Sequence, residues 1–150
     1  MTRILPQVAH MAAAEVGVPA DFALARLADA EFLGGWSLGS MDLQPLDGGV
    51  FRGRSLFDGA PAHIEIHVSE TLGLIDYAVG TAEHRSARIF IRVTPGPVLG
   101  QGAESCVVTL HALRAATASD AAWTRTCTVH ETEILLIKAQ LETALTGQSG

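Results

Sequence analysis

Residues 123–141 read WTRTCTVHETEILLIKAQL, and this stretch decides the fold. At roughly 100° per residue, its apolar side chains gather on one face of an α-helix. Ser119 and Asp120 supply an N-cap before it, and Gly147 lies just past its expected end. The sequence therefore predicts a long C-terminal helix with one buried face. That face consists of Trp123, Cys127, His130, Ile134, Ile137, Leu141 and Leu145.

His130 interrupts this apolar face. Burying an unpaired imidazole costs about 1–3 kcal/mol, so the ring needs a partner. One interpretation is a core histidine that is hydrogen-bonded to a backbone carbonyl or a neighbouring side chain. The other is a polar group that faces a cavity, where it orients a ligand oxygen or moves a proton. We expect Glu131 and Glu133 to be charges on the flank of the helix, with Lys138 beside them.

The length of this helix constrains the sheet that covers it. About 27 helical residues span roughly 40 Å, which is longer than a single strand. Only a strongly curved sheet could follow such a helix along its length. Val129, Leu135 and Leu136 lie off the predicted buried face, which indicates contact with other helices or with a partner subunit.

The rest of the chain supplies that sheet. Residues 7–18 favour a strand, and two short helices follow, broken near Asp29 and ended by Gly34-Gly35 before Trp36. From there the apolar residues alternate with period two, with turn signals such as Asp47-Gly48-Gly49 between the runs. These spacings make neighbouring strands antiparallel. Six strands are expected, at 39–49, 50–57, 62–70, 74–80, 86–93 and 106–115.

Composition and charge exclude several classes of protein. The 150 residues suit one domain over 1–150, with an ordered core at about 7–146, and a hydrophobic content of 48% excludes disorder. The net charge is −6 and the sequence has no cluster of basic residues, which argues against binding of nucleic acid. No apolar run approaches the roughly 20 residues of a membrane span. The first residues lack a secretory signal, so we expect a soluble cytoplasmic protein.

The order of elements, Trp36 after the paired short helices and the long last helix resemble the helix-grip fold of the START-like (SRPBCC) superfamily. That superfamily includes START lipid-transfer domains, the birch-pollen-allergen family and the polyketide cyclase/dehydrase and lipid-transport family. The resemblance implies an α+β fold: a curved antiparallel sheet of about seven strands around the C-terminal helix. It also implies a cavity for lipids, sterols or polyketides. We expect no cofactor. Members share no fixed catalytic set, so the resemblance assigns no catalytic residue here.

The predicted cavity lining follows from the strand and helix faces. Tyr77 shares the Ile75 and Val79 side of its strand, which we take as inward, so its hydroxyl could meet His130 or a ligand. His130 and Tyr77 are therefore the candidate acid/base residues. The full set of predicted ligand-binding residues is Trp36, Met41, Phe51, Ile64, Tyr77, Ile89, Trp123, Cys127, His130 and Ile134.

His63, Glu65 and His67 point to one side of their strand, a spacing that zinc enzymes use. However, the alternating Ile64 and Ile66 claim the core side. We therefore expect the three residues on a convex, solvated face, without the further ligand that a metal site requires. The same face is predicted to hold Arg52, Arg54, Asp76, Arg88 and Arg92.

The remaining motifs exclude other chemistry. Cys106 and Cys127 are expected to be reduced, buried thiols, too few for a structural zinc site. The glycine-rich residues 96–102 lack the lysine of a phosphate-binding loop.

Three functions stay open on the sequence alone. The first is binding of a small hydrophobic molecule without catalysis. The second is a polyketide cyclase or dehydratase that uses cavity acid/base residues. The third is an assembly or interaction subunit, for which a homodimer is the expected form.

Overall fold

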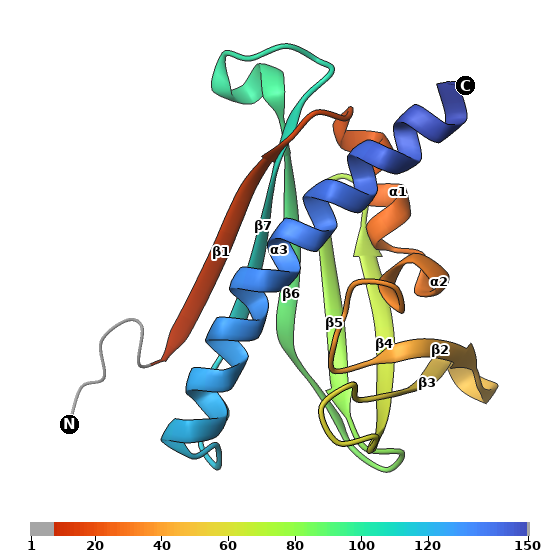
Figure 1. The fold of residues 1–150 in the computed structure, drawn as a ribbon, viewed down its shortest axis with the longest axis vertical. Helices are drawn as coiled ribbons and strands as arrows, with labels where there is room; N and C mark the ends of the chain where they lie inside the picture. The colour runs from red at the N-terminus through yellow and green to blue at the C-terminus, as the bar shows by residue number, and fades with distance from the viewer. Residues whose placement is uncertain (1–7, 150) are drawn as a thin grey trace.

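Within residues 8–149, which the computed structural model describes, seven antiparallel strands form one sheet crossed by a long helix (Figure 1). The strand order is β1-β7-β6-β5-β4-β3-β2. This architecture confirms the predicted α+β helix-grip fold. Gln7, where the first strand was predicted to begin, lies outside the described residues, as does Gly150. The strands are β1 (Ala9–Val16), β2 (Met41–Pro45), β3 (Val50–Arg54), β4 (Pro61–Ser69), β5 (Leu74–Gly80), β6 (Arg85–Pro95) and β7 (Cys106–Leu113).

Two short helices, α1 (Ala20–Leu27) and α2 (Ala30–Leu33), follow β1 as predicted. The Asp29 side chain accepts a hydrogen bond from the Glu31 backbone N–H at 3.4 Å and caps α2, which explains the break between them. Two single 3₁₀ turns, at Asp47–Gly49 and Gly96–Leu99, complete the connections. Among residues 8–149, no helix is both long and apolar enough to span a bilayer.

The last helix, α3 (Asp120–Ser149), begins where the sequence places it, because the Ser119 hydroxyl accepts from the Ala122 backbone N–H at 3.1 Å. The expected end before Gly147 is wrong, since the helix continues through this glycine to Ser149. A glycine inside a helix costs only about 1 kcal/mol relative to alanine. Gly147 is exposed and therefore neither packs nor terminates the helix.

The core lies between α3 and the concave face of the sheet. Ile75, Ile91 and Leu110 of the sheet and Ile137 and Leu141 of α3 are fully buried. These residues sit at the alternating strand positions and the helical spacing that the sequence indicates.

The helix does not lie over the middle of the sheet, however. It packs along β1 and β7, whereas β4 and β5 stand away from its first half (Figure 1). Two contacts fix α3 on the β1 side. Lys138 Nζ donates to the Glu15 carbonyl at 2.7 Å, and Glu142 Oε2 accepts from the Gly17 backbone N–H at 2.7 Å. This offset leaves room beside α3 over β4, β5 and β6.

Candidate ligand-binding site

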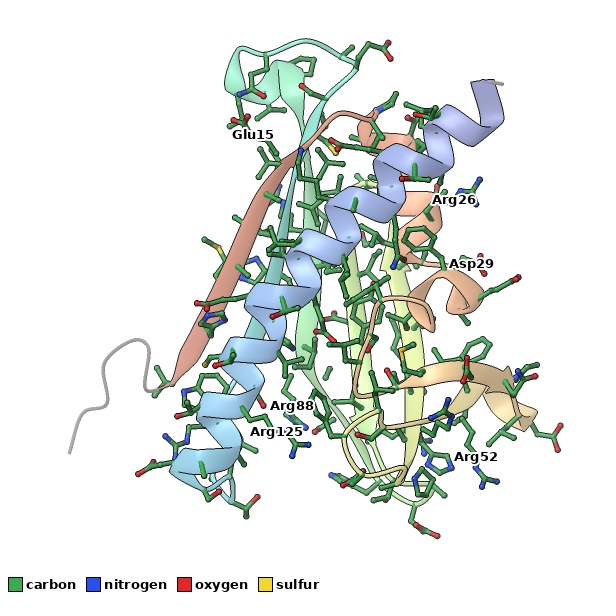
Figure 2. All side chains as sticks on the ribbon, viewed as in Figure 1. Glu15, Arg26, Asp29, Arg52, Arg88 and Arg125 are labelled. Atoms are coloured by element: carbon green, nitrogen blue, oxygen red, sulfur yellow. The ribbon has the colours of Figure 1, made fainter. Side chains whose placement is uncertain are left out.

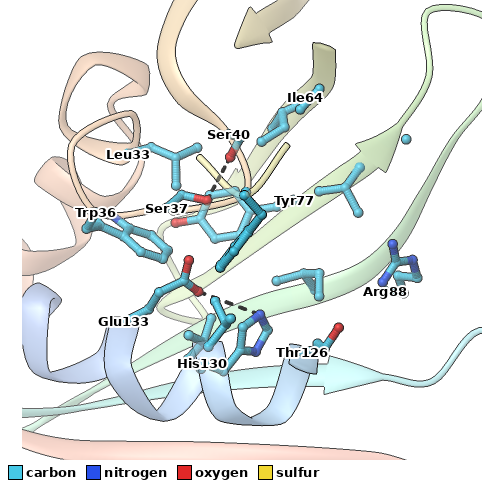
Figure 3. Close-up of a pocket in the computed structure, with 18 of the residues that line it drawn as sticks. Leu33, Trp36, Ser37, Ser40, Ile64, Tyr77, Arg88, Thr126, His130 and Glu133 are labelled. Carbon is cyan, nitrogen blue, oxygen red and sulfur yellow. Dashed lines mark hydrogen bonds and ion pairs between the residues drawn. The ribbon is translucent and has the colours of Figure 1, made fainter. Parts of the chain in front are cut away.

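A cavity of about 220 Å³ occupies this room. It lies between the first half of α3, the segment that follows α2, and strands β4 to β6 (Figure 3). Most of its wall is apolar. The apolar lining residues are Leu33, Trp36, Phe57, Ala62, Ile64, Tyr77, Val79, Ile89, Leu110 and Val129.

Two polar side chains of α3, His130 and Glu133, face the cavity together. His130 Nε2 lies 3.8 Å from Glu133 Oε1, and the two side chains are only 9% and 4% exposed. The Leu38 backbone N–H donates to Glu133 Oε2 at 2.7 Å. His130 Nδ1 has no hydrogen-bond partner within residues 8–149. The expectation that Glu133 is a solvated flank charge is therefore wrong: it lies one turn from His130, and the segment after α2 covers it.

Burial sets the protonation of this pair. It lowers the pKa of His130 to about 4, and the nearby charges of His10 and Arg88 act in the same direction. Burial also raises the pKa of Glu133 to about 7, although the hydrogen bond from Leu38 opposes part of that rise. A low dielectric disfavours the charged form of both groups. Near neutral pH the cavity thus holds a neutral imidazole beside a carboxyl that exchanges its proton readily.

Arg88 also lines the cavity, which corrects its predicted place on the convex face. Ile89 pairs with Tyr77, but Ala87 pairs with the next residue, Ala78. Arg88 is thus the extra residue of a β-bulge. Such a bulge breaks the alternation and redirects the side chain.

Arg125, in the first turns of α3, is the second cation at the cavity. Its guanidinium carbon lies 4.4 Å from the centre of the Phe57 ring, a cation–π contact that holds the side chain at the opening. Figure 2 shows Arg88 and Arg125 at the end of the molecule where α3 begins. The remaining polar residues of the wall are Ser37, Ser40, His63 and Thr126.

Tyr77 and Trp36 form the aromatic part of the wall. Their rings meet edge to face with centroids 6.3 Å apart. The Tyr77 hydroxyl donates to the Leu27 carbonyl at 2.7 Å, so its hydrogen is held by the backbone and not by His130. Burial raises the pKa of Tyr77, and we assign it no proton transfer. Trp36 Nε1 is buried without a hydrogen-bond partner in the described part of the chain.

Five of the ten predicted ligand-binding residues line the cavity: Trp36, Ile64, Tyr77, Ile89 and His130. The other five lie elsewhere. Ile134 belongs to the packed core, Trp123 is buried, and Phe51 packs against the core. Met41 and Cys127 are half-buried outside the cavity wall.

The offset of α3 explains this division. Because the helix leans toward β1, the cavity meets its flank rather than the centre of the predicted apolar face. The lining residues Thr126, Val129, His130 and Glu133 follow the spacing i, i+3, i+4, i+7. That pattern was available in the sequence, whereas the redirection of Arg88 had no sequence signal.

The candidate metal ligands do not converge. Arg85 Nε donates to Glu65 Oε2 at 2.6 Å, and this bond is the main reason that the pKa of Glu65 is lowered. His67 Nε2 lies 3.4 Å from the same carboxylate. The expectation that His63 lies on the convex, solvated face is wrong, since it lines the cavity and its Nδ1 is buried. Within residues 8–149, no three His, Cys, Asp or Glu side chains are grouped to hold a metal ion.

Neither cysteine contributes a thiolate. Cys106 is buried, and burial raises its pKa to about 11. Cys127, which was expected to be buried, is only half-buried, and its pKa is also raised mainly by burial. Both are free thiols.

Comparison with known proteins yields neighbours of the same fold. No protein-family model matches the sequence, and no curated protein matches it. A conserved protein from Geobacillus kaustophilus aligns with 91% of this chain and 97% of its own at 12% identity and a TM-score of 0.66. The Aha1 dimer from Colwellia psychrerythraea, solved in solution, aligns with 90% of this chain and 96% of its own at 13% identity and a TM-score of 0.65.

A third neighbour is the di-domain ARO/CYC BexL from the BE-7585A biosynthetic pathway. It matches 89% of this chain at 16% identity and a TM-score of 0.67. The chain spans under half of that protein, 46% of its length. At these low sequence identities the structural similarity establishes the helix-grip fold. It does not establish an activity, which has to be argued from the residues of the site.

Proposed function

We propose that this protein binds a small, largely apolar molecule in the cavity between α3 and strands β4 to β6. The observation that carries the proposal is a largely apolar cavity whose lining residues hold three buried polar atoms, His130 Nδ1, Trp36 Nε1 and His63 Nδ1, that no described residue satisfies. Leaving such an atom unpaired costs about 1–3 kcal/mol, and a polar group on a ligand would recover that energy.

The size of the cavity narrows the class of ligand. A volume of about 220 Å³ is below the roughly 300–1,000 Å³ of pockets for drug-sized molecules. It suits one or two rings better than a whole sterol or lipid chain. A small polyketide-derived aromatic compound is therefore the ligand we propose, with residues 1–150 acting as one binding domain in the cytoplasm. The ARO/CYC neighbour of the same fold, from a biosynthetic pathway, supports this choice.

Thermal unfolding with a graded panel tests the proposal. Naphthol-sized aromatics, flavonoids, fatty acids and sterols would each be added to the purified chain. A ligand at about 100 times its Kd stabilises the fold by about 2.7 kcal/mol, or roughly 5–10 °C in Tm for a domain of this size. A panel without any shift would contradict the proposal.

A matched pair of variants locates the binding. Val129→Phe fills the cavity from α3, whereas Leu135→Phe adds the same ring to an exposed position of that helix. We expect the first variant to lose the ligand-induced shift and the second to keep it. Equal loss in both, or in neither, would place the ligand elsewhere.

The His130–Glu133 pair favours a second candidate activity, dehydration of a β-hydroxy ketone, as in a polyketide cyclase or dehydratase. The neutral imidazole takes a proton from the carbon beside the carbonyl, and the protonated carboxyl gives its proton to the departing hydroxyl. One water molecule leaves. The imidazolium and carboxylate then face each other across 3.8 Å, and transfer of the proton back to Glu133 restores the pair.

The aldol adduct of acetone and benzaldehyde tests this activity, because its dehydration yields a conjugated enone with strong ultraviolet absorption. His130→Ala and Glu133→Gln should each lower the rate by about 100-fold or more, without a matching loss of fold. Leu135→Ala is the control. Turnover that survives both substitutions, or loss of stability alone, would reject the assignment.

Of the three residues of α3 that suggested contact with a partner subunit, one is exposed in the structure. Val129 lines the cavity and Leu136 packs against the core, while Leu135 is 64% exposed. Because the neighbour from Colwellia psychrerythraea is a dimer, a homodimer of this protein stays a prediction. Sedimentation of a strict monomer would remove it.

A further inference from the structure

We infer that the ligand of the proposed cavity carries a carboxylate, which Arg88 and Arg125 bind at the opening while the apolar rings lie inside. This inference rests on the proposed function and specifies its ligand. The grounds are the placement of the two guanidinium groups, their lack of acidic partners and the charge of the cavity.

Arg88 is a half-buried cation with no acid beside it. Among the described residues it forms neither a hydrogen bond nor an ion pair, although it lines the cavity. Arg54, Arg85 and Arg114, by contrast, each contact a carboxylate within 3.0 Å. A guanidinium redirected by a bulge toward an apolar cavity, and left unpaired there, is suited to an anion that arrives with a ligand.

Arg125 meets the same opening from α3. Its contact with the Phe57 ring is a cation–π contact, and within residues 8–149 its guanidinium forms no hydrogen bond or ion pair. That contact also restricts the side chain before binding, which reduces the entropy lost when an anion is held. Two arginines from separate elements, β6 and α3, thus converge on one cavity.

The charge of the wall favours a single negative charge on the ligand. The chain as a whole carries −6, but among the described residues this wall has two arginines and one acid, the buried Glu133. Arg88 and Arg125 therefore make the opening attractive to anions in an otherwise acidic protein. A planar carboxylate fits the fork of a guanidinium. A phosphate dianion would place a second negative charge closer to Glu133, so we choose the carboxylate.

Calorimetric titration with naphthoate and naphthamide, substituted at the same ring position, isolates the charge. The two probes share shape and ring area and differ in charge. We expect naphthoate to bind about tenfold or more tightly than the amide, since hydrogen bonds between two charged groups are stronger than those to a neutral amide. Added salt should narrow the gap, because part of the attraction acts at the exposed opening.

Substitutions test whether the difference in affinity between naphthoate and naphthamide comes from Arg88 and Arg125. Arg88→Gln and Arg125→Gln should each lower naphthoate affinity about tenfold and leave naphthamide affinity nearly unchanged. Arg92→Gln removes the same charge from an exposed position of β6 outside the cavity and should change neither. Circular dichroism checks each fold. Arg88→Lys keeps the charge without the fork and should lose several-fold in affinity, so it decides the case if Arg88→Gln does not fold.

The outcomes separate this inference from the proposed function. Equal binding of the two probes would overturn the carboxylate and leave the apolar cavity standing. Binding of neither probe would overturn both. Tighter binding of naphthyl phosphate than of naphthoate would reject a carboxylate ligand, and an equal effect of Arg92→Gln would reduce the preference to general surface charge.

Discussion

The two flanks of α3 differ in how their polar groups are satisfied. On the β1 side, Lys138 contacts both Glu15 and Glu142, and Glu131 lies 3.3 Å from His10 Nε2, although His10 Nδ1 has no partner among the described residues. On the cavity side, His130 keeps an unpaired nitrogen and Arg125 has no acidic partner in the described chain. The paired flank attaches the helix to the sheet. The cavity side, which we call the unpaired flank, carries polar groups that lack a full set of partners among the described residues.

The largest expected effect is the difference in stability between substitutions at buried and at exposed positions of α3. Ile137→Ala removes a fully buried side chain of α3 and should lower the free energy of unfolding by about 2–5 kcal/mol. Leu135→Ala, two residues away and exposed, should change it by less than about 0.5 kcal/mol. Urea unfolding of both variants measures the difference. Equal values would mean that α3 does not present the face described above.

The second effect is on the pH dependence of stability, to which His130 and Glu133 on the cavity side contribute in opposite directions. His130 has a folded pKa below its usual value, so its contribution to stability is lost as pH falls from about 6.5 to 4. Glu133 has a folded pKa above its usual value, so stability is lost as pH rises from about 4.5 to 7. Each amounts to on the order of 3 kcal/mol at full effect, and the two nearly cancel in the shared window.

Single substitutions should expose each dependence. In Glu133→Gln, whose amide oxygen can still accept from Leu38, stability should rise with pH between 4 and 6.5. In His130→Asn it should fall between 4.5 and 7. His10, from β1, and Arg88, from β6, face the imidazole and stay in place in both variants. Parallel stability curves for the two variants would contradict this assignment.

The smallest effect tests the paired flank. Lys138→Met removes one cation from a contact in which the lysine and Glu142 side chains are 41% and 37% exposed. Exposed ion pairs contribute about 0–1 kcal/mol, so the free energy of unfolding should fall by no more than that. Ligand affinity should stay unchanged, because Lys138 lies away from the cavity. A change in affinity would show that the two flanks are coupled.

The fold was predictable because its signals are periodic. The alternation in β4 and β5, the Asp29 cap and the spacing from Trp123 to Leu141 each define an element without reference to distant residues. The candidate site was predictable only in part. Carboxylates are seldom buried, so Glu133 was placed in solvent, although its spacing from His130 puts both on one side of the helix.

Two features had no local signal at all. The bulge at Arg88 depends on how β5 and β6 pair, since one extra residue in one strand breaks the alternation that the sequence shows. The offset of α3 toward β1 depends on contacts between residues more than 120 positions apart, such as Lys138 with Glu15. Such contacts decide which flank of a helix faces a cavity, and they cannot be predicted from the residue pattern of the helix itself.

We propose above that a small apolar acid binds beside the unpaired flank of α3. Nuclear Overhauser effects between naphthoate protons and the labelled methyl groups of the protein test it most directly. We expect contacts to Val129 and Ile89, which line the cavity, and none to Ile134 in the packed core or to the exposed Leu135. Contacts to Leu135, or bound naphthoate that meets neither Val129 nor Ile89, would contradict it.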